Sequence, residues 1–144
     1  MEQRLSLITL GVTDLGRSRL FYERLGWRGR KVEETVFFEA GGTVVVLWGR
    51  DKPAADAGVA GDGQGTFDGV VLAHNVRSRA EVDDVVRAAE RAGAVITRPA
   101  AETFYGGYAA CFADPDGHIW EIAHNPGFGF ADDGSIVLPD FGEG

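Results

Sequence analysis

The chain contains the sequence LITLGVTD at residues 7–14 and the related sequence VLAHNVRS at residues 71–78. Each begins as an apolar run typical of a strand and ends in Asp or Ser, which commonly cap the N-terminus of a helix. Each is followed by a helical pattern that ends at a glycine, Gly26 in the first half and Gly93 in the second. The repeat predicts two modules of one architecture, with equivalent positions in both.

A second match lies in the later part of each half. Residues 38–46, FEAGGTVVV, correspond to residues 112–121, FADPDGHIWE, with one residue fewer in the first copy. Val46 in the first copy stands where Glu121 stands in the second. A carboxylate at a position that is aliphatic in the other copy makes Glu121 a candidate functional residue.

Local patterns predict a strand, a helix and three further strands in each half. In the first half these are residues 4–12, a helix from 14 to 26, and strands at 27–33, 35–39 and 43–48. In the second half they are residues 69–76, a helix from 78 to 93, and strands at 95–98, 108–113 and 118–124. We therefore predict an α+β fold in which two βαβββ modules form a curved eight-stranded mixed sheet around a cavity.

The chain divides into a first module (1–49), a linker (50–67), a second module (68–125) and a C-terminal tail (126–144), together one domain. The linker contains a short helical pattern and then four glycines between residues 58 and 65. The tail contains a turn at 132–134 and a short apolar run at 136–138.

Composition excludes several classes of partner. The chain has 144 residues and a net charge of −8, which disfavours nucleic acid because phosphate binding needs clustered Lys and Arg. No apolar run approaches the roughly 18 residues of a membrane span. The lone Cys111 cannot form an internal disulfide, and the N-terminus has no signal-peptide pattern. We expect a cytoplasmic protein that binds neither nucleic acid nor membranes.

The paired pattern resembles the vicinal oxygen chelate superfamily, most closely through TLGVTDL at residues 9–15 and FADPDGHIWEI at residues 112–122. That superfamily includes glyoxalase I, bleomycin-resistance proteins, fosfomycin-resistance enzymes and extradiol dioxygenases. The resemblance covers about residues 5–125. It implies a small-molecule cavity, most often in a dimer. In catalytic members, His, Glu or Gln on inward-facing strand positions hold a divalent metal.

The resemblance places the four metal-ligand positions on Leu7, Val46, Val71 and Glu121. Three of these are aliphatic and cannot donate to a cation. A tight transition-metal site needs about three protein ligands. We therefore predict that the four positions are vestigial, and that the protein uses no metal and no other cofactor.

Strand alternation places Glu121 on the cavity face, where its partner would be Thr9, Asn75, a tyrosine hydroxyl or a cationic ligand. A register slip of one residue would instead place it on the surface. The histidines form no ligand cluster, and His118, which follows the hairpin glycine, is expected to be exposed.

Aromatic residues are the other candidates for a ligand site. Trp48 shares the alternation of Val46, and three more aromatic residues lie around the glycines at 106–107. The alternative is that they close the end of the sheet or form a dimer contact. The candidate ligand-binding set is Thr9, Trp48, Asn75, Phe104, Tyr105, Tyr108 and Glu121.

The sequence is compatible with three functions. The favoured one is a metal-free protein, resembling bleomycin-resistance proteins, that binds or sequesters a partly aromatic and cationic compound by stacking and through Glu121. The second is a lyase, isomerase or dioxygenase-like enzyme that uses Glu121 as acid, base or metal ligand, beside Tyr105 or Tyr108. The third is a partner-binding module with a vestigial cavity. We also expect a homodimer, because exposed sheet edges need covering.

Overall fold

The computed structural model describes residues 3, 7–56, 68, 70–137 and 139–140, so the expectations for residues 4–6, 57–67, 69 and 138 lie outside it. The first module contains β1 (Leu7–Val12), α1 (Leu15–Arg24), β2 (Arg30–Val32), β3 (Thr35–Ala40) and β4 (Thr43–Gly49). The second contains β5 (Val71–Asn75), α3 (Arg79–Ala92), β6 (Val95–Glu102), β7 (Tyr108–Ala113) and β8 (Ile119–His124). Between the modules lies α2 (Asp51–Asp56), and the tail forms β9 (Gly129–Phe130) and β10 (Ile136–Val137).

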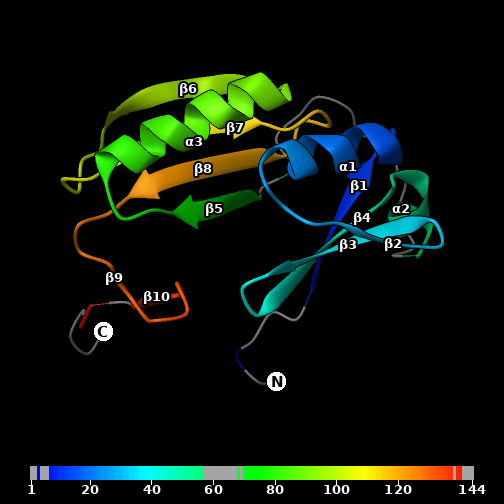
Figure 1. The fold of residues 1–144 in the computed structure, drawn as a ribbon, viewed down its shortest axis with the longest axis horizontal. Helices are drawn as coiled ribbons and strands as arrows, with labels where there is room; N and C mark the ends of the chain where they lie inside the picture. Colours follow the sequence, from blue (N-terminus) through cyan, green and yellow to red (C-terminus); the bar gives the residue numbers. More distant parts are fainter. Residues whose placement is uncertain (1–2, 4–6, 57–67, 69, 138, 141–144) are drawn as a thin grey trace.

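The eight strands of the two modules form two four-stranded sheets of identical order, β1-β4-β3-β2 and β5-β8-β7-β6 (Figure 1). In each sheet the first strand runs parallel to the fourth, and the other pairs are antiparallel. The predicted α+β fold of two βαβββ modules is confirmed. The described strands of the two sheets are not hydrogen-bonded to each other, so the eight strands are divided four and four.

Sheet register makes positions in the two modules equivalent. Leu7 pairs with Val44 in the first sheet, as Val71 pairs with Ile119 in the second. Two residues further on, Thr9 pairs with Val46, as Ala73 pairs with Glu121. Leu7 therefore occupies the place of Val71, and Val46 occupies the place of Glu121.

The caps of the two long helices follow from local sequence. The Asp14 side chain accepts a 2.9 Å hydrogen bond from the amide of Arg17, and the Ser78 hydroxyl accepts one of 3.2 Å from Glu81. Gly93 ends α3 with a left-handed φ of 108°, a conformation that costs a glycine little.

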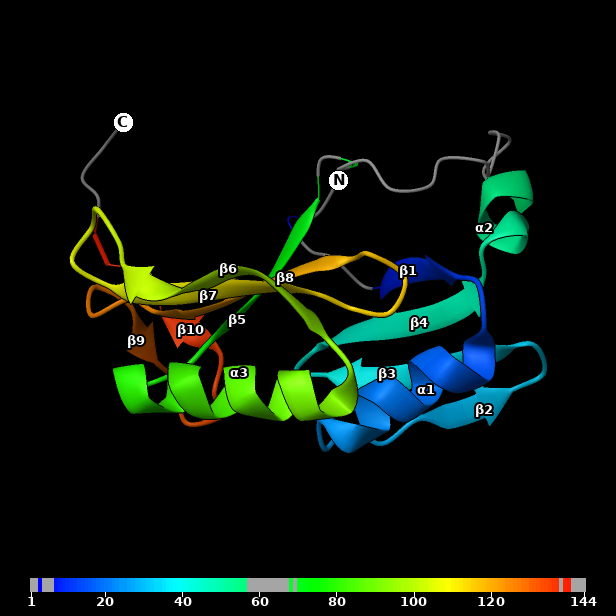
Figure 2. The ribbon, with the colours of Figure 1, turned by 90° about the horizontal axis from the view of Figure 1, so that it is seen from above.

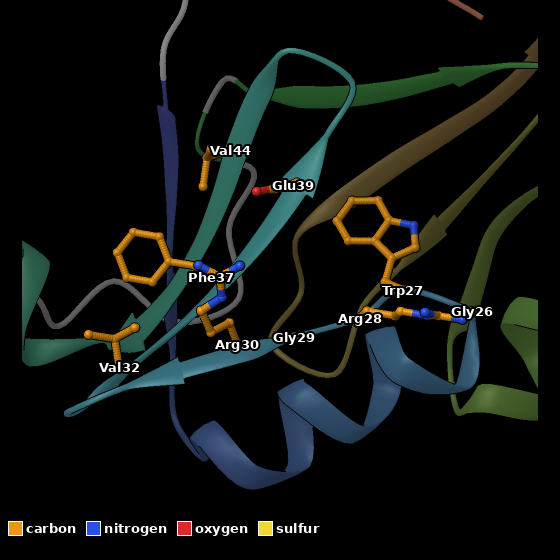
Figure 3. A pocket seen from close by; sticks show the side chains of 9 residues that line it. All are labelled: Gly26, Trp27, Arg28, Gly29, Arg30, Val32, Phe37, Glu39 and Val44. Atoms are coloured by element: carbon orange, nitrogen blue, oxygen red, sulfur yellow. The ribbon is translucent and has the colours of Figure 1, made fainter. Parts of the chain in front are cut away.

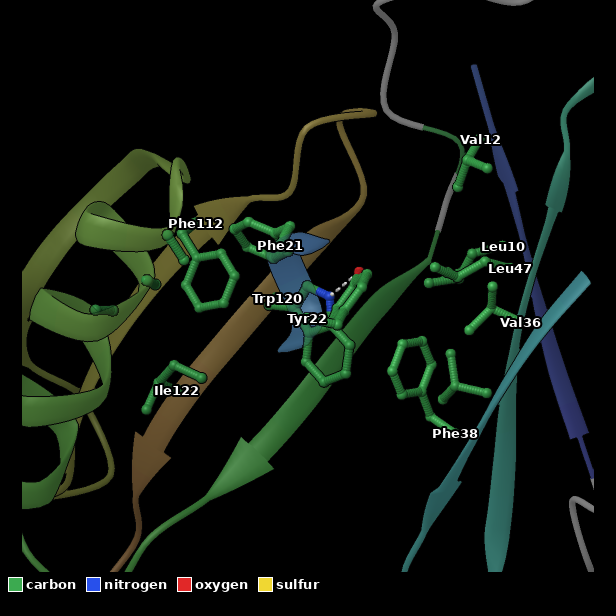
Figure 4. Packing of buried hydrophobic residues seen from close by; sticks show 14 of the residues in the cluster. Leu10, Val12, Phe21, Tyr22, Val36, Phe38, Leu47, Phe112, Trp120 and Ile122 are labelled. Carbon is green, nitrogen blue, oxygen red and sulfur yellow. Dashed lines mark hydrogen bonds between the residues drawn. The ribbon is translucent and has the colours of Figure 1, made fainter. Parts of the chain in front are cut away.

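Helices α1 and α3 lie on the same side of the two sheets (Figure 2), and we call the sheet face that they cover the outer face. The opposite face is the inner face. Residues of the outer faces form one hydrophobic cluster that includes both modules (Figure 4). Phe21 of α1 packs edge-on against Phe112 of β7, while the neighbouring Tyr22 contacts both Phe38 and Trp120. Helix α1 therefore packs against the second module as well as its own.

Buried polar bonds hold the turn between β7 and β8 against α1. The Tyr22 hydroxyl donates a 2.6 Å hydrogen bond to Asp114 Oδ2 and accepts one of 3.2 Å from Trp120 Nε1 (Figure 4). Asp114 Oδ1 accepts from the backbone amides of Asp116 and His118 at 2.9 and 2.8 Å. Burial, followed by the charge of Asp114, raises the pKa of Tyr22 well above its ordinary value, so the tyrosine stays a donor.

Asp116 lies at the N-terminal end of α1. Its Oδ1 accepts from the Thr13 amide at 2.8 Å and the Thr13 hydroxyl at 2.9 Å, and its Oδ2 accepts from the Ser18 hydroxyl. Arg17 forms an ion pair with it at 3.3 Å. Burial tends to raise the pKa of Asp116, but the hydrogen bonds from Ser18 and Thr13 outweigh it and hold the pKa below its ordinary value.

Three local expectations were wrong. The strand expected over residues 27–33 covers only Arg30–Val32, because the segment before it is bonded to the end of α1 through the Trp27 amide and the Tyr22 carbonyl. His118 is half-buried rather than exposed, because its Nε2 lies 2.8 Å from the Gly11 carbonyl oxygen and donates to it across the module boundary. Strand β6 does not end at Arg98 but continues through Pro99 to Glu102, with register shifts on either side of Arg98. An edge strand tolerates proline because the missing N–H has no ladder partner. No described helix is long and apolar enough to cross a membrane.

Replacing Asp116 with Asn should lower the free energy of unfolding by about 1–3 kcal/mol, the usual cost of leaving a buried group such as the Ser18 hydroxyl poorly satisfied. The folded-state pKa of Asp116 lies below its ordinary value of 3.8. Its stabilisation is therefore fully present above pH 3.8 and is lost as the pH falls through the folded-state pKa. Urea unfolding at neutral pH and in steps below pH 3.8 measures both effects.

The exposed Asp132 provides a matched control, since Asp132→Asn removes the same charge from the tail. Equal stability losses in the two variants would show that Asp116 does not hold the modules together.

Candidate functional site

Glu121 lies on the inner face of the second module. Its neighbours Trp120 and Ile122 are buried in the outer-face cluster, so alternation along β8 points Glu121 the other way. It pairs with Ala73 on one side and Cys111 on the other, and its side chain is 33% exposed.

Arg98 of β6 is the partner of this carboxylate. Its Nη2 lies 3.4 Å from Glu121 Oε2 and 3.6 Å from Cys111 Sγ. Arg98 and Cys111 are directly paired across β6 and β7, so the arginine reaches over one strand to the next. Sequence reasoning missed this residue because the register of β6 is irregular at this point, and no local pattern predicts the shift.

The four metal-ligand positions do not form a metal site. Leu7 and Val71 are 47% and 48% exposed on the inner faces, and Val46 is buried. In the part of the chain that the structure describes, no three His, Cys, Asp or Glu side chains are placed to hold a metal ion. Of the four positions only Glu121 offers a donor atom, so the residues present do not fit a divalent metal.

The remaining candidate residues are divided between different places. Thr9, Trp48 and Asn75 have inner-face positions in the register of β1, β4 and β5. Phe104 and Tyr105 are exposed in the turn between β6 and β7, where their rings pack edge to face at 5.3 Å.

Tyr108 lies on the outer face. Its hydroxyl donates to Asp83 of α3 at 2.8 Å, and the Arg79 guanidinium lies 5.5 Å from its ring centre. Tyr108 and Glu121 therefore lie on opposite faces of the sheet, and within this chain they cannot act on one ligand together.

A cavity of about 930 Å³ opens on the first module (Figure 3). It extends from the inner face of β2, β3 and β4 to the segment that joins α1 to β2. Sequence reasoning did not select its residues, because they come from separate segments of the chain, the α1–β2 connection and strands β2, β3 and β4. The lining consists of Gly26, Trp27, Arg28, Gly29, Arg30, Val32, Phe37, Glu39 and Val44.

The family model of the Glyoxalase/Bleomycin resistance protein/Dioxygenase superfamily matches residues 4–122. The chain belongs to this superfamily. No curated protein matches it. A structure of a glyoxalase-related enzyme from Fulvimarina pelagi is 38% identical, covering 95% of this chain and 99% of that one, with a TM-score of 0.86.

Two further structures are more distant. A hypothetical protein from S. aureus is 26% identical, with 86% of this chain and 94% of that chain covered and a TM-score of 0.75. Lactoylglutathione lyase from Agrobacterium tumefaciens is 21% identical, with 85% and 94% covered and a TM-score of 0.65. At that identity the likeness shows the superfamily fold alone.

We expect the purified protein to hold no stoichiometric zinc, iron, nickel or manganese, because Leu7, Val46 and Val71 offer no lone pairs. Elemental analysis after dialysis measures this, and melting with added metal or chelator provides a second readout that should not shift. About one equivalent of metal surviving dialysis would contradict the prediction.

Proposed function

We propose that this member of the superfamily binds and sequesters a small, partly aromatic compound on the inner faces of its modules, without a metal. The observation that carries the proposal is a cavity of ligand size on the first module, together with the apolar chemistry of Leu7, Val46 and Val71 at three of the four ligand positions. Apolar walls with a few polar groups are typical of small-molecule sites.

The charge of the compound is a separate question. An isolated carboxylate at Glu121 on the inner face would favour a cationic ligand. Arg98, with its 3.4 Å ion pair, provides that partner within the chain. A cationic compound would have to displace Arg98, so we base the proposal on the aromatic part of the ligand and not on a positive charge at Glu121.

An enzyme is the second candidate, because the 38% identical relative is described as a glyoxalase-related enzyme. In a lyase, isomerase or dioxygenase-like reaction, Glu121 would be the acid or base. A compound that binds and is then turned over, with turnover lost and binding kept in Glu121→Gln, would favour this second function over sequestration.

A thermal-shift screen of aromatic compounds tests the proposal against a vestigial cavity. Stabilisation that grows with ligand concentration would support binding, as mass action requires. A library of planar compounds of every charge that leaves melting unchanged would contradict the proposal.

Arg98→Gln should free Glu121 for a cationic ligand. We expect 2-naphthylmethylammonium to bind this variant about tenfold more tightly than the original protein, because a charge-assisted hydrogen bond is gained. Isothermal titration calorimetry measures the change. The double variant Arg98→Gln, Glu121→Gln is the control and should lose the gain. Equal affinity in all three proteins would place Glu121 outside the ligand site.

We further propose a homodimer. Apolar side chains are exposed on the inner faces and at the edge of β6, including Leu7, Val71 and Val95, the last of these 65% exposed. In the tail, Ile136 and Val137 are also exposed. A second copy that covers these side chains would remove them from water. Light scattering at micromolar concentration should give twice the mass of the chain, and a monomeric mass would contradict the proposal.

A further inference from the structure

We propose that the cavity of the first module binds a compound carrying a carboxylate beside a flat apolar ring, with Arg28 and Arg30 as the anion-binding residues. This inference rests on the proposed function, since it assumes that a small molecule occupies the inner face. It adds the chemical class of that molecule and the residues that select it.

The two modules contain an arginine at the same place. In the first sheet Arg30 pairs with Phe37, and Phe37 pairs with Val46. In the second sheet Arg98 pairs with Cys111, which pairs with Glu121. Because Val46 and Glu121 are equivalent, Arg30 and Arg98 are equivalent as well.

Arg30 and Arg98 differ in the residue that lies beyond the neighbouring strand. Arg98 reaches across one strand and forms its ion pair with Glu121. Arg30 extends towards Phe37 (Figure 3), but the residue beyond Phe37 is the aliphatic Val46. A ligand carboxylate in the cavity beside Phe37 would therefore give Arg30 the partner that Glu121 gives Arg98.

Arg28 and Arg30 form no ion pair and no side-chain hydrogen bond with the residues that the structure describes. Both are exposed at the cavity. Five other arginines do have acidic partners, namely Arg17, Arg19, Arg79, Arg87 and Arg98. In Figure 3 Arg30 extends towards Phe37 and Arg28 extends towards Gly26, so each guanidinium is a separate candidate partner for a carboxylate, whose two oxygens match the planar fork of donors.

The segment that carries the arginines is fixed before any ligand binds. At its start, the Trp27 amide donates a 3.1 Å hydrogen bond to the Tyr22 carbonyl at the end of α1. At Gly29, a Cβ atom would lie 2.8 Å from Val36 Cγ1 and 2.9 Å from Phe38 Cε1, so only glycine fits this close to the sheet. The Arg19 guanidinium also donates to the Gly29 carbonyl at 3.3 Å. A fixed backbone between two binding residues lowers the entropic cost of holding the ligand.

The rest of the lining fits an apolar ring. Phe37 is half-buried on β3, and Val32 and Val44 lie on the strands to either side of it. Among the lining residues that the structure describes, Glu39 is the only acidic one, against two arginines, so their charges sum to one positive charge. This local charge is opposite in sign to the net charge of −8 of the whole chain.

The probes are three compounds of one shape: 2-naphthoate, the neutral 2-naphthamide and 2-naphthylmethylammonium. Calorimetry should show 2-naphthoate binding at least about tenfold more tightly than the amide, and Arg28→Gln and Arg30→Gln should each remove about tenfold. The exposed Arg91 of α3 provides the control, because Arg91→Gln removes the same charge away from the cavity. Glu39→Gln should change affinity in the opposite direction and tighten 2-naphthoate binding a few-fold, since a like charge is removed.

A substitution at Val46 tests the comparison of modules directly. Val46→Glu places a carboxylate where Glu121 stands in the second module, so it should compete with the ligand for Arg30 and abolish 2-naphthoate binding. Val46→Gln, which has nearly the same shape, should retain more of it. If the Val46 variants have a lowered melting temperature, the arginine variants still test the inference. Arg28 and Arg30 are exposed, so their replacement leaves the core intact.

A separate measurement locates the ligand in the cavity. The Trp27 indole signal in ¹⁵N NMR spectra should shift with 2-naphthoate, and the signal is assigned by Trp27→Phe. Equal binding of acid and amide, or equal loss in Arg91→Gln and the cavity variants, would overturn the inference. Binding of the amide or amine but not the acid would overturn the inference and leave the proposed function standing. Binding of none of the probes, with a negative library screen, would overturn both.

Discussion

The hydrogen bond from Tyr22 to Asp114 is the contact on which the relation between the two modules depends. It joins α1 of the first module to the β7–β8 turn of the second in a position where neither residue reaches water. A buried carboxylate without partners would be costly, and Asp114 has three donors within 2.9 Å, the Tyr22 hydroxyl and the amides of Asp116 and His118. Losing any one of them would leave a buried charge less well satisfied, so the turn, α1 and the core are maintained together.

That contact also determines which way Glu121 points. The turn closes with Gly117 at a φ of 88° and returns with the Asp114 amide bonded to the His118 carbonyl. From His118 onward β8 runs without a bulge along β7, and alternation places Trp120 on the outer face and Glu121 on the inner one. A shift of one residue would bury Glu121 in the aromatic cluster and expose Trp120. The cost of that exchange is why the register, and with it the inner-face chemistry, is well specified.

The predictable features were those that repeat or act locally. The duplicated pattern gave the two modules, and the caps at Asp14, Ser78 and Gly93 gave the helix ends, because each depends on residues a few positions apart. The contacts of Arg98 and His118 could not be predicted from repeats or local patterns. The first depends on an irregular register in an edge strand, and the second on a contact between residues 107 positions apart. The cavity residues were missed because Arg28, Glu39 and Val44 meet only after three separate segments are folded together.

Duplication explains why the two inner faces have similar frameworks and different chemistry. Both keep an arginine on the outermost strand of the sheet, directed across its neighbour towards the last strand of the module. The second module places a carboxylate at the end of that path and so satisfies its arginine internally. The first module places Val46 there, beside an aromatic ring, and leaves the charge available. The two faces therefore differ by one substitution at an equivalent position. In the second module the arginine is paired within the chain, and in the first module it would be paired only when a ligand binds.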